Sequence, residues 1–259
     1  MPKIIGTLSV LELDTLSKHY GRDFLPYPFR FTRSIPYESA DDVRVFRASV
    51  LDGFKSGKFD HLRRWLDVQL RDADLRIECM YVYADGKPSV DVSATRWNDI
   101  GYIARQDDHD VISVQQVTAY DIGPEVVKLV DMTGRPGALG TITVPSIGIT
   151  APVSSRPRED DSDVPIKANV FSTSEPAHKL VPYTDLLAGG EIYTAWRPAR
   201  QWGRDRVKGP IGWIATRHGD YMVEQPHEYA TPVTRQQLLE KVNRSISKEI
   251  ADLKSQRSE

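Results

Sequence analysis

Four consecutive residues, Asp107, Asp108, His109 and Asp110, collect the carboxylate and imidazole groups that can bind metal ions. They fall between two strand-like runs, in a position typical of a turn. Consecutive turn residues are expected to point in different directions, whereas a metal site needs ligand atoms that converge. We therefore expect solvated turn residues here and no metal site. His218-Gly219-Asp220 marks a second turn, in which Gly219 and Asp220 have conformational roles.

Three further patterns lack what their chemistry would need. The acidic run from Glu159 to Asp163 has neither the glycine nor the spaced carboxylates of a calcium loop. Cys79 alternates with apolar strand residues, which favours a buried thiol over a nucleophile. Residues 134–140 are rich in glycine but lack the Lys-Ser/Thr pair of a phosphate loop. Because no motif joins a nucleophile, a base and an orienting group, the sequence predicts a protein that is not an enzyme and needs no cofactor.

Composition points away from nucleic acids and membranes. The 259 residues are 40% hydrophobic and carry a formal net charge of −2, with a pI near 6.3, whereas a nucleic-acid-binding domain presents a basic face. The single cysteine excludes an internal disulfide and fits a reducing compartment. The apolar residues near the N-terminus are too few for a signal peptide, and no run approaches the roughly 20 residues of a membrane span. We expect a cytoplasmic protein with no nucleic acid partner and no membrane insertion.

Two short sequences occur twice along the chain. Residues 100–104 (IGYIA) recur at 211–215 (IGWIA), a shift of 211 − 100 = 111 positions, and residues 6–10 (GTLSV) resemble residues 140–144 (GTITV). Both pairs keep their order, and each copy is expected to lead into a turn, a second strand and a helix. We therefore predict a duplicated body with pseudo-two-fold symmetry. Its halves are residues 1–138 and 139–259.

Hydrophobic periodicity predicts an α+β protein with a central, mainly antiparallel sheet. Alternation of apolar and polar residues indicates the strands, and apolar stripes that follow capping signals indicate the flanking helices. Strands are expected at 3–5, 77–83, 90–95, 100–105, 111–117 and within 191–229, and helices from 9, twice within 36–74, at 122–130 and from 234. The acidic, proline-rich residues 150–182 predict a flexible loop.

The order of these elements resembles the EspG family of type VII (ESX) secretion chaperones. The resemblance is carried by residues 6–13 (GTLSVLEL), 25–29 (LPYPF), 100–105 (IGYIAR) and 141–145 (TITVP). It implies two pseudo-symmetric halves that share one sheet flanked by helical bundles. It also implies a cytosolic chaperone that binds the helical tip of the PPE protein in a PE-PPE heterodimer. The client would be kept soluble and directed to the ESX secretion machinery, which the chaperone contacts indirectly.

The resemblance further implies where the client binds. Family members contact it through the loop between the second and third strands and through the C-terminal helical bundle. The residues placed in that loop here are Arg96, Trp97, Asn98 and Asp99. Tryptophan beside arginine suits an interface anchor, although Trp97 also fits a core position at a strand end. On the last helix, the polar residues expected to face the client are Gln236, Asn243 and Ser247.

Two other classes of function remain open at this stage. An α+β enzyme would place its site between the two halves, with His109 or His218 as the base. A deep polar pocket that holds a histidine paired with a carboxylate would favour this alternative. A regulatory module that binds a small ligand between the halves and dimerises through its helices is the second alternative. A small molecule that copurifies with the protein would favour it.

Overall fold

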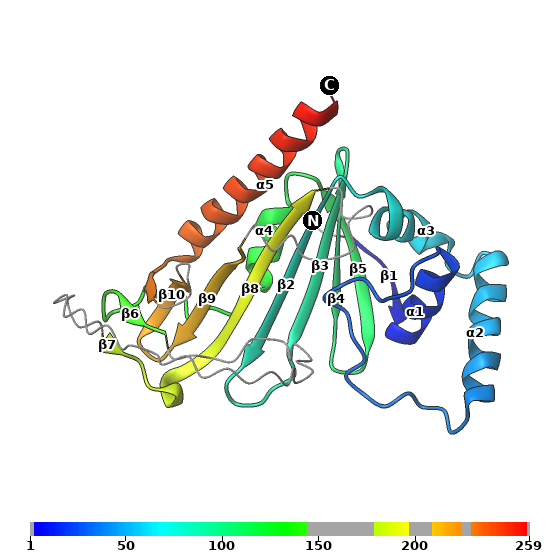
Figure 1. Ribbon diagram of the computed structural model, residues 1–259, viewed down its shortest axis with the longest axis horizontal. Helices are drawn as coiled ribbons and strands as arrows, with labels where there is room; N and C mark the ends of the chain where they lie inside the picture. The colour runs from blue at the N-terminus through cyan, green and yellow to red at the C-terminus, as the bar shows by residue number, and fades with distance from the viewer. Residues whose placement is uncertain (1–2, 145–178, 197–208, 224–228, 258–259) are drawn as a thin grey trace, which may run out of the picture.

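The computed structural model describes residues 3–144, 179–196, 209–223 and 229–257. Their strands form one eleven-stranded sheet in the order β1-β5-β4-β3-β2-β8-β9-β10-β11-β6-β7 (Figure 1). Every neighbouring pair is antiparallel except the short pair β6 and β7. Helices pack on both faces of this sheet. The predicted α+β class with a mainly antiparallel sheet is confirmed.

The first five strands are β1 (Lys3–Ser9), β2 (Leu75–Tyr83), β3 (Val90–Trp97), β4 (Ile100–Gln106) and β5 (Val111–Thr118). Strands β2 to β5 follow one another as hairpins, and β1 forms the edge of the sheet beside β5. Their pleat separates two environments. On β2, Ile77 and Cys79 belong to one hydrophobic core, whereas Arg76 and Glu78, which alternate with them, form an ion pair of 2.9 Å on the opposite face. The period of two in the sequence corresponds to these two faces.

A helical bundle covers one face of this half: α1 (Val10–His19), α2 (Ala40–Lys55), α3 (Asp60–Asp67) and the π-helix η1 (Val68–Asp72). The capping box predicted for α1 is present, because Ser9 accepts the Glu12 N–H at 3.1 Å and Glu12 accepts the Ser9 N–H at 2.8 Å. The bundle shares its core with β1, β4 and β5, and Trp65 of α3 is fully buried in it. Two helices between residues 36 and 74 are therefore confirmed.

The rest of the sheet contains β6 (Ile142–Thr143), β7 (Lys179–Leu180), β8 (Leu186–Trp196), β9 (Ile211–Thr216), β10 (Gly219–Val223) and β11 (Tyr229–Pro232), with the 3₁₀ turn η2 (Tyr183–Asp185) before β8. β8 joins this part to the first five strands. It pairs with β2 along its length, from Leu75 opposite Trp196 to Tyr83 opposite Ala188. One continuous sheet therefore links the two predicted halves.

Helices α4 (Ile122–Leu129) and α5 (Arg235–Arg257) cover the other face. Their contact is close because Gly123 has no side chain: a Cβ there would lie 2.2 Å from the Asn243 Oδ1 atom. At the other end of the pair, the Arg235 guanidinium donates to the carbonyls of Val127 and Val130 at 2.6 and 3.0 Å. These contacts satisfy carbonyls at the C-terminus of α4, which have no partner within the helix. The core beneath both helices contains residues from β2, β3, β8 and β9.

The duplication remains a prediction, and part of its basis is corrected. Residues 100–104 lie in β4, the third strand from the β2–β8 junction, whereas residues 211–215 lie in β9, the second strand on the other side. The five-residue repeat therefore does not join equivalent positions in the sheet. After β9, two strands precede α5, where one was expected. The second pair of matching residues lies in or next to β1 and β6, each the fifth strand from the junction.

Most of the loop predicted at 150–182 lies outside the described residues, and β7 occupies 179–180. None of the helices that the structure describes is long and apolar enough to cross a membrane.

Candidate functional site

The residues predicted to bind a partner begin at the β3–β4 turn. Trp97 pairs with Ile100, so that Asn98 and Asp99 alone form the turn. Asn98 adopts a left-handed conformation with φ 55°, which asparagine tolerates better than most residues. Its N–H donates to the Asp74 carboxylate at 2.9 Å, and the Asp99 carbonyl accepts the N–H of Ala119 at 2.9 Å. The turn is short and held from both sides.

Arg96 and Trp97 point to opposite faces of the sheet, because successive strand residues alternate. The Trp97 ring packs against the core under α1–α3, and the Arg64 guanidinium of α3 lies over it, 3.7 Å from the ring centroid. This arrangement is a cation–π contact. Arg96 donates instead to the carbonyl of Asn98 at 2.9 Å. Trp97 is therefore half-buried in the helical bundle and cannot share one flat surface with α5.

The three polar residues predicted on α5 are exposed, but Gln236 lies at its start whereas Asn243 and Ser247 lie near its middle. Gln236 is in the first turn, beside the Arg235 cap at the C-terminus of α4. Asn243 packs against Gly123 at the start of α4, close to the β3–β4 turn through Ala119. Ser247 lies one helical turn beyond Asn243. The structure thus places Asn243 and Ser247, but not Gln236, at the same end of the sheet as Asn98 and Asp99.

The loop between the second and third strands lies elsewhere than at residues 96–99. Because Lys3–Ser9 forms β1, the loop between the second and third strands comprises residues 84–89. Residues 96 and 97 end the third strand, and residues 98 and 99 form the turn between the third and fourth strands. The two loops are at opposite ends of the sheet, since β2 and β3 are antiparallel neighbours. The position assigned from sequence to this loop was therefore wrong by one hairpin.

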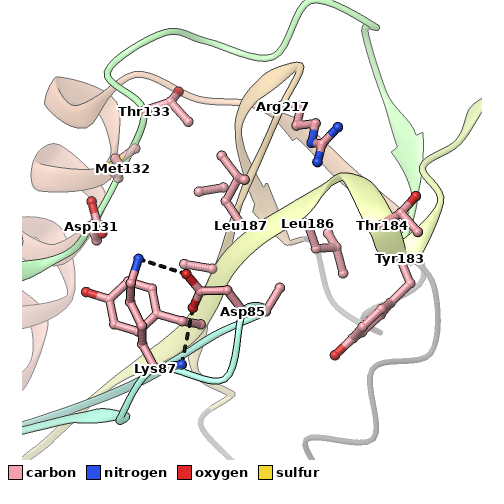
Figure 2. Close-up of a pocket in the computed structure, with 14 residues that line it drawn as sticks. Asp85, Lys87, Asp131, Met132, Thr133, Tyr183, Thr184, Leu186, Leu187 and Arg217 are labelled. Carbon is pink, nitrogen blue, oxygen red and sulfur yellow. Dashed lines mark hydrogen bonds and ion pairs between the residues drawn. The ribbon is translucent and has the colours of Figure 1, made fainter.

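Residues of this β2–β3 loop line a pocket of about 520 Å³ (Figure 2). Its other walls come from three distant segments: the residues after α4, the start of β8, and the β9–β10 turn. Figure 2 shows Leu187 between Asp131 on one side and Arg217 on the other. The side chains of Tyr183 and Leu187 are 61% and 41% exposed. The lining residues are Tyr83, Ala84, Asp85, Lys87, Asp131, Met132, Thr133, Tyr183, Thr184, Leu186, Leu187, Ala188, Ala215 and Arg217.

A buried carboxylate fixes one wall of this pocket. Asp220, which is 1% exposed, accepts the backbone N–H groups of Thr133 and Gly134, both at 2.9 Å. Its own N–H donates to the carbonyl of Arg135, and its carbonyl accepts the N–H of Val233. Asp220 thereby ties the segment after α4 to β10 and to the start of α5. We expect the wall to be rigid because these contacts are charge-assisted and shielded from water.

The charges around the pocket are distributed unevenly. Lys87 forms an ion pair with Asp85 at 2.7 Å, and this hydrogen bond raises the pKa of Lys87 and lowers the pKa of Asp85. Arg217 is exposed, and among the described residues no carboxylate forms an ion pair with it. The Asp185 carbonyl accepts the Arg217 N–H at 2.9 Å, but the Asp185 carboxylate contacts His218 Nε2 at 3.0 Å. Among the described residues, Arg217 is therefore the pocket cation without an ion-pair partner, while Asp131 is a second carboxylate in the pocket lining.

The arrangement offers little for catalysis in the part of the chain that the structure describes. The His218–Asp185 pair is the kind of contact that would favour an enzyme, but neither residue lines the pocket. Among the described residues, no hydroxyl or thiol group contacts the His218 ring. Cys79 is fully buried, and burial raises the pKa of its thiol to about 12. Such a thiol remains protonated at neutral pH.

The acidic turn needs one correction. The ligand atoms of Asp107, Asp108 and His109 lie within 4.8 Å of one another, so the expectation that they point apart was wrong. All three residues are exposed. Asp107 Oδ1 already accepts the backbone N–H groups of His109 and Val111, at 2.8 and 2.9 Å. These hydrogen bonds are those of a turn that is stabilised by the side chain of one of its own residues, Asp107.

Sequence reasoning did not find the pocket residues. Tyr183 and Leu187 lie between the loop predicted at 150–182 and the strands predicted from 191, where no element was expected, and Arg217 precedes a glycine turn. The sequence signal that could have found Arg217 was its position directly after an apolar strand and before a turn. Tyr120, which is 89% exposed in the turn between β5 and α4, was also missed.

Comparison with known proteins gives one family and one structural relative to report. The EspG family matches residues 9–244. No curated protein matches the chain. Eleven chains of solved structures match. One is the Mycobacterium tuberculosis type VII secretion system chaperone EspG5 in complex with a PE25-PPE41 dimer, which is 13% identical with a TM-score of 0.46 and covers 92% of this chain and 94% of that chain. The family match includes both ends of the sheet and the first part of α5.

Proposed function

The chain belongs to the EspG family, and we propose that it is a cytosolic chaperone that binds a PE-PPE heterodimer and delivers it to a type VII secretion system. The family match over residues 9–244 carries this proposal, because it includes nearly all of the described sheet and helices. Holding a client requires a binding surface and no reacting group. The protein is accordingly proposed not to be an enzyme and to need no cofactor.

We place the client at the pocket beside the β2–β3 loop. A chaperone that covers an apolar helical tip must offer apolar surface of its own. This end of the sheet exposes Val82, Tyr183 and Leu187 by 39%, 61% and 41%, and the last two line a concave site. A stable interface removes about 800 Å² from each partner, and a few aromatic anchors supply most of the energy. Tyr183 is the proposed anchor, and Gln236 at the start of α5 is a neighbouring contact.

The opposite end of the sheet is the competing surface. It contains the sequence-predicted residues Arg96, Asn98 and Asp99, with Asn243 and Ser247 of α5 nearby. Tyr120 is its exposed aromatic residue. The sequence-predicted residues on this surface are polar or charged, and Trp97 contributes little to it because the ring packs beneath Arg64. We therefore expect it to contribute less to the binding of an apolar client.

The proposal is tested by coexpression with a PE-PPE pair encoded next to this chain's gene, followed by size-exclusion chromatography. The expected result is a three-component complex that elutes as one peak. Tyr183→Ala should weaken binding by about 2 kcal/mol, as loss of an interface anchor does, while Tyr120→Ala serves as a matched exposed tyrosine at the other end. Loss of binding in Tyr120→Ala alone would move the client to the β3–β4 turn. Failure of the wild type to bind any such pair would refute the chaperone function.

A further inference from the structure

Arg217 presents a charge that client binding must compensate. Its side chain lines the pocket opposite Asp131, next to the apolar residues Leu186 and Leu187 (Figure 2). The second cation of the pocket, Lys87, is already neutralised by Asp85 at 2.7 Å. The carbonyl of Asp185 accepts the Arg217 N–H, but the Asp185 carboxylate contacts His218. The Asp220 carboxylate, three positions from Arg217, accepts the N–H groups of Thr133 and Gly134. Among the described residues, Arg217 is thus the pocket cation without an ion-pair partner.

A partner that fills the pocket covers this guanidinium and removes water from it. Burying a charge is costly unless the partner supplies a counter-charge and hydrogen bonds. Guanidinium and carboxylate groups match in geometry, because two parallel N–H donors can meet two oxygens. The apolar floor beside Arg217 excludes water and strengthens such a contact. The pocket therefore suits a segment that carries an apolar side chain next to an acidic one.

We propose that Arg217 selects clients by forming an ion pair with a carboxylate on the segment that occupies the pocket. This inference rests on the proposed chaperone function and specifies the chemistry of its client. Arg217 acts here as a specificity-determining residue. A client with a neutral residue at that position would leave the guanidinium buried and unpaired.

The test measures the affinity of the full chain for its PE-PPE client at low and at high salt. Arg217→Glu should weaken binding at least tenfold, because it replaces an attraction with a repulsion. Arg217→Lys should retain part of the affinity, since it keeps the charge but loses the paired donors. Arg217→Ala should also reduce the salt dependence of binding. The control is Arg244→Glu, which makes the same change in net charge at an exposed position on α5.

Two outcomes would overturn the inference while the chaperone function stands. One is a wild-type affinity in Arg217→Glu. The other is an equal loss in Arg217→Glu and Arg244→Glu, which would assign the effect to overall charge. Absence of binding by the wild-type chain refutes the proposed function, and this inference with it. Arg217 is exposed, so thermal unfolding of each variant should match that of the wild type.

Discussion

Replacement of Trp97 by alanine separates a structural role from a binding role for this residue. The ring packs against the core beneath α1–α3, and the Arg64 guanidinium lies 3.7 Å from its centroid. Trp97→Ala removes both contacts and leaves a space between β3 and α3. We expect the variant to lose stability and to retain client binding.

The magnitude follows from how much of the ring is buried. Truncation of a fully buried tryptophan costs about 3–5 kcal/mol, and Trp97 is only half-buried. We expect a loss of about 2–3 kcal/mol in the free energy of unfolding, which includes about 0.5–1 kcal/mol from the cation–π contact. For a chain of this size, that loss lowers Tm by about 5–10 °C.

Chemical denaturation of four proteins measures these terms. The set is the wild type, Trp97→Ala, Arg64→Ala and the double variant, from which a double-mutant cycle gives the Trp97–Arg64 coupling energy. Tyr120→Ala is the control, because this exposed aromatic residue lies at the same end of the sheet and should change stability by less than about 0.5 kcal/mol. Unchanged stability of Trp97→Ala together with a tenfold loss of client affinity would refute the reasoning and identify Trp97 as an interface anchor.

Three further predictions concern stability. Asp220→Asn should lower the free energy of unfolding, measured with urea, by about 2–3 kcal/mol, because an amide cannot accept both N–H groups that the carboxylate binds. The control Asp131→Asn, at an exposed position, should lower it by less than about 0.5 kcal/mol. Equal effects of the two substitutions would contradict this account. Burial raises the pKa of Cys79 to about 12 from an ordinary value of 9.0. The unfolded chain therefore loses the thiol proton first, and the free energy of unfolding should fall above pH 9 by up to about 1.4 kcal/mol per pH unit. Cys79→Ala should flatten this decline, and an unchanged slope would exclude the thiol as its cause. Residues 1–138 and 139–259 should not fold separately, because each would expose the β2 or β8 edge and part of a shared core; a sharp unfolding transition from either half would show an autonomous domain.

Local features of this fold could be predicted from the sequence because their causes lie within a few residues. The capping box at Ser9 depends on a side chain three positions away, and the alternation in β2 depends on its pleat. The pocket has no local cause. It joins Tyr83, Asp131 and Arg217. The pairing of β2 with β8 and of β8 with β9 brings Tyr83 close to Arg217, and the hydrogen bonds of Asp220 to Thr133 and Gly134 hold the segment that contains Asp131. The partner of Trp97, Arg64, likewise comes from a helix that precedes β2.

The repeated pentapeptide shows why a shared pattern can mislead about equivalence. In β4, a Cβ on Gly101 would lie 2.6 Å from the Ile122 side chain, so this glycine allows α4 to approach the sheet. In β9, a Cβ on Gly212 would lie 3.0 Å from Val223, a neighbour on β10 of the same sheet. Gly101 leaves room for a helix to pack on the sheet, whereas Gly212 leaves room for a side chain of the neighbouring strand. The same five-residue pattern thus meets two different packing needs and does not mark equivalent positions in the sheet. Evidence for duplication must therefore come from positions that match in the sheet, such as β1 and β6, and not from the stronger sequence match.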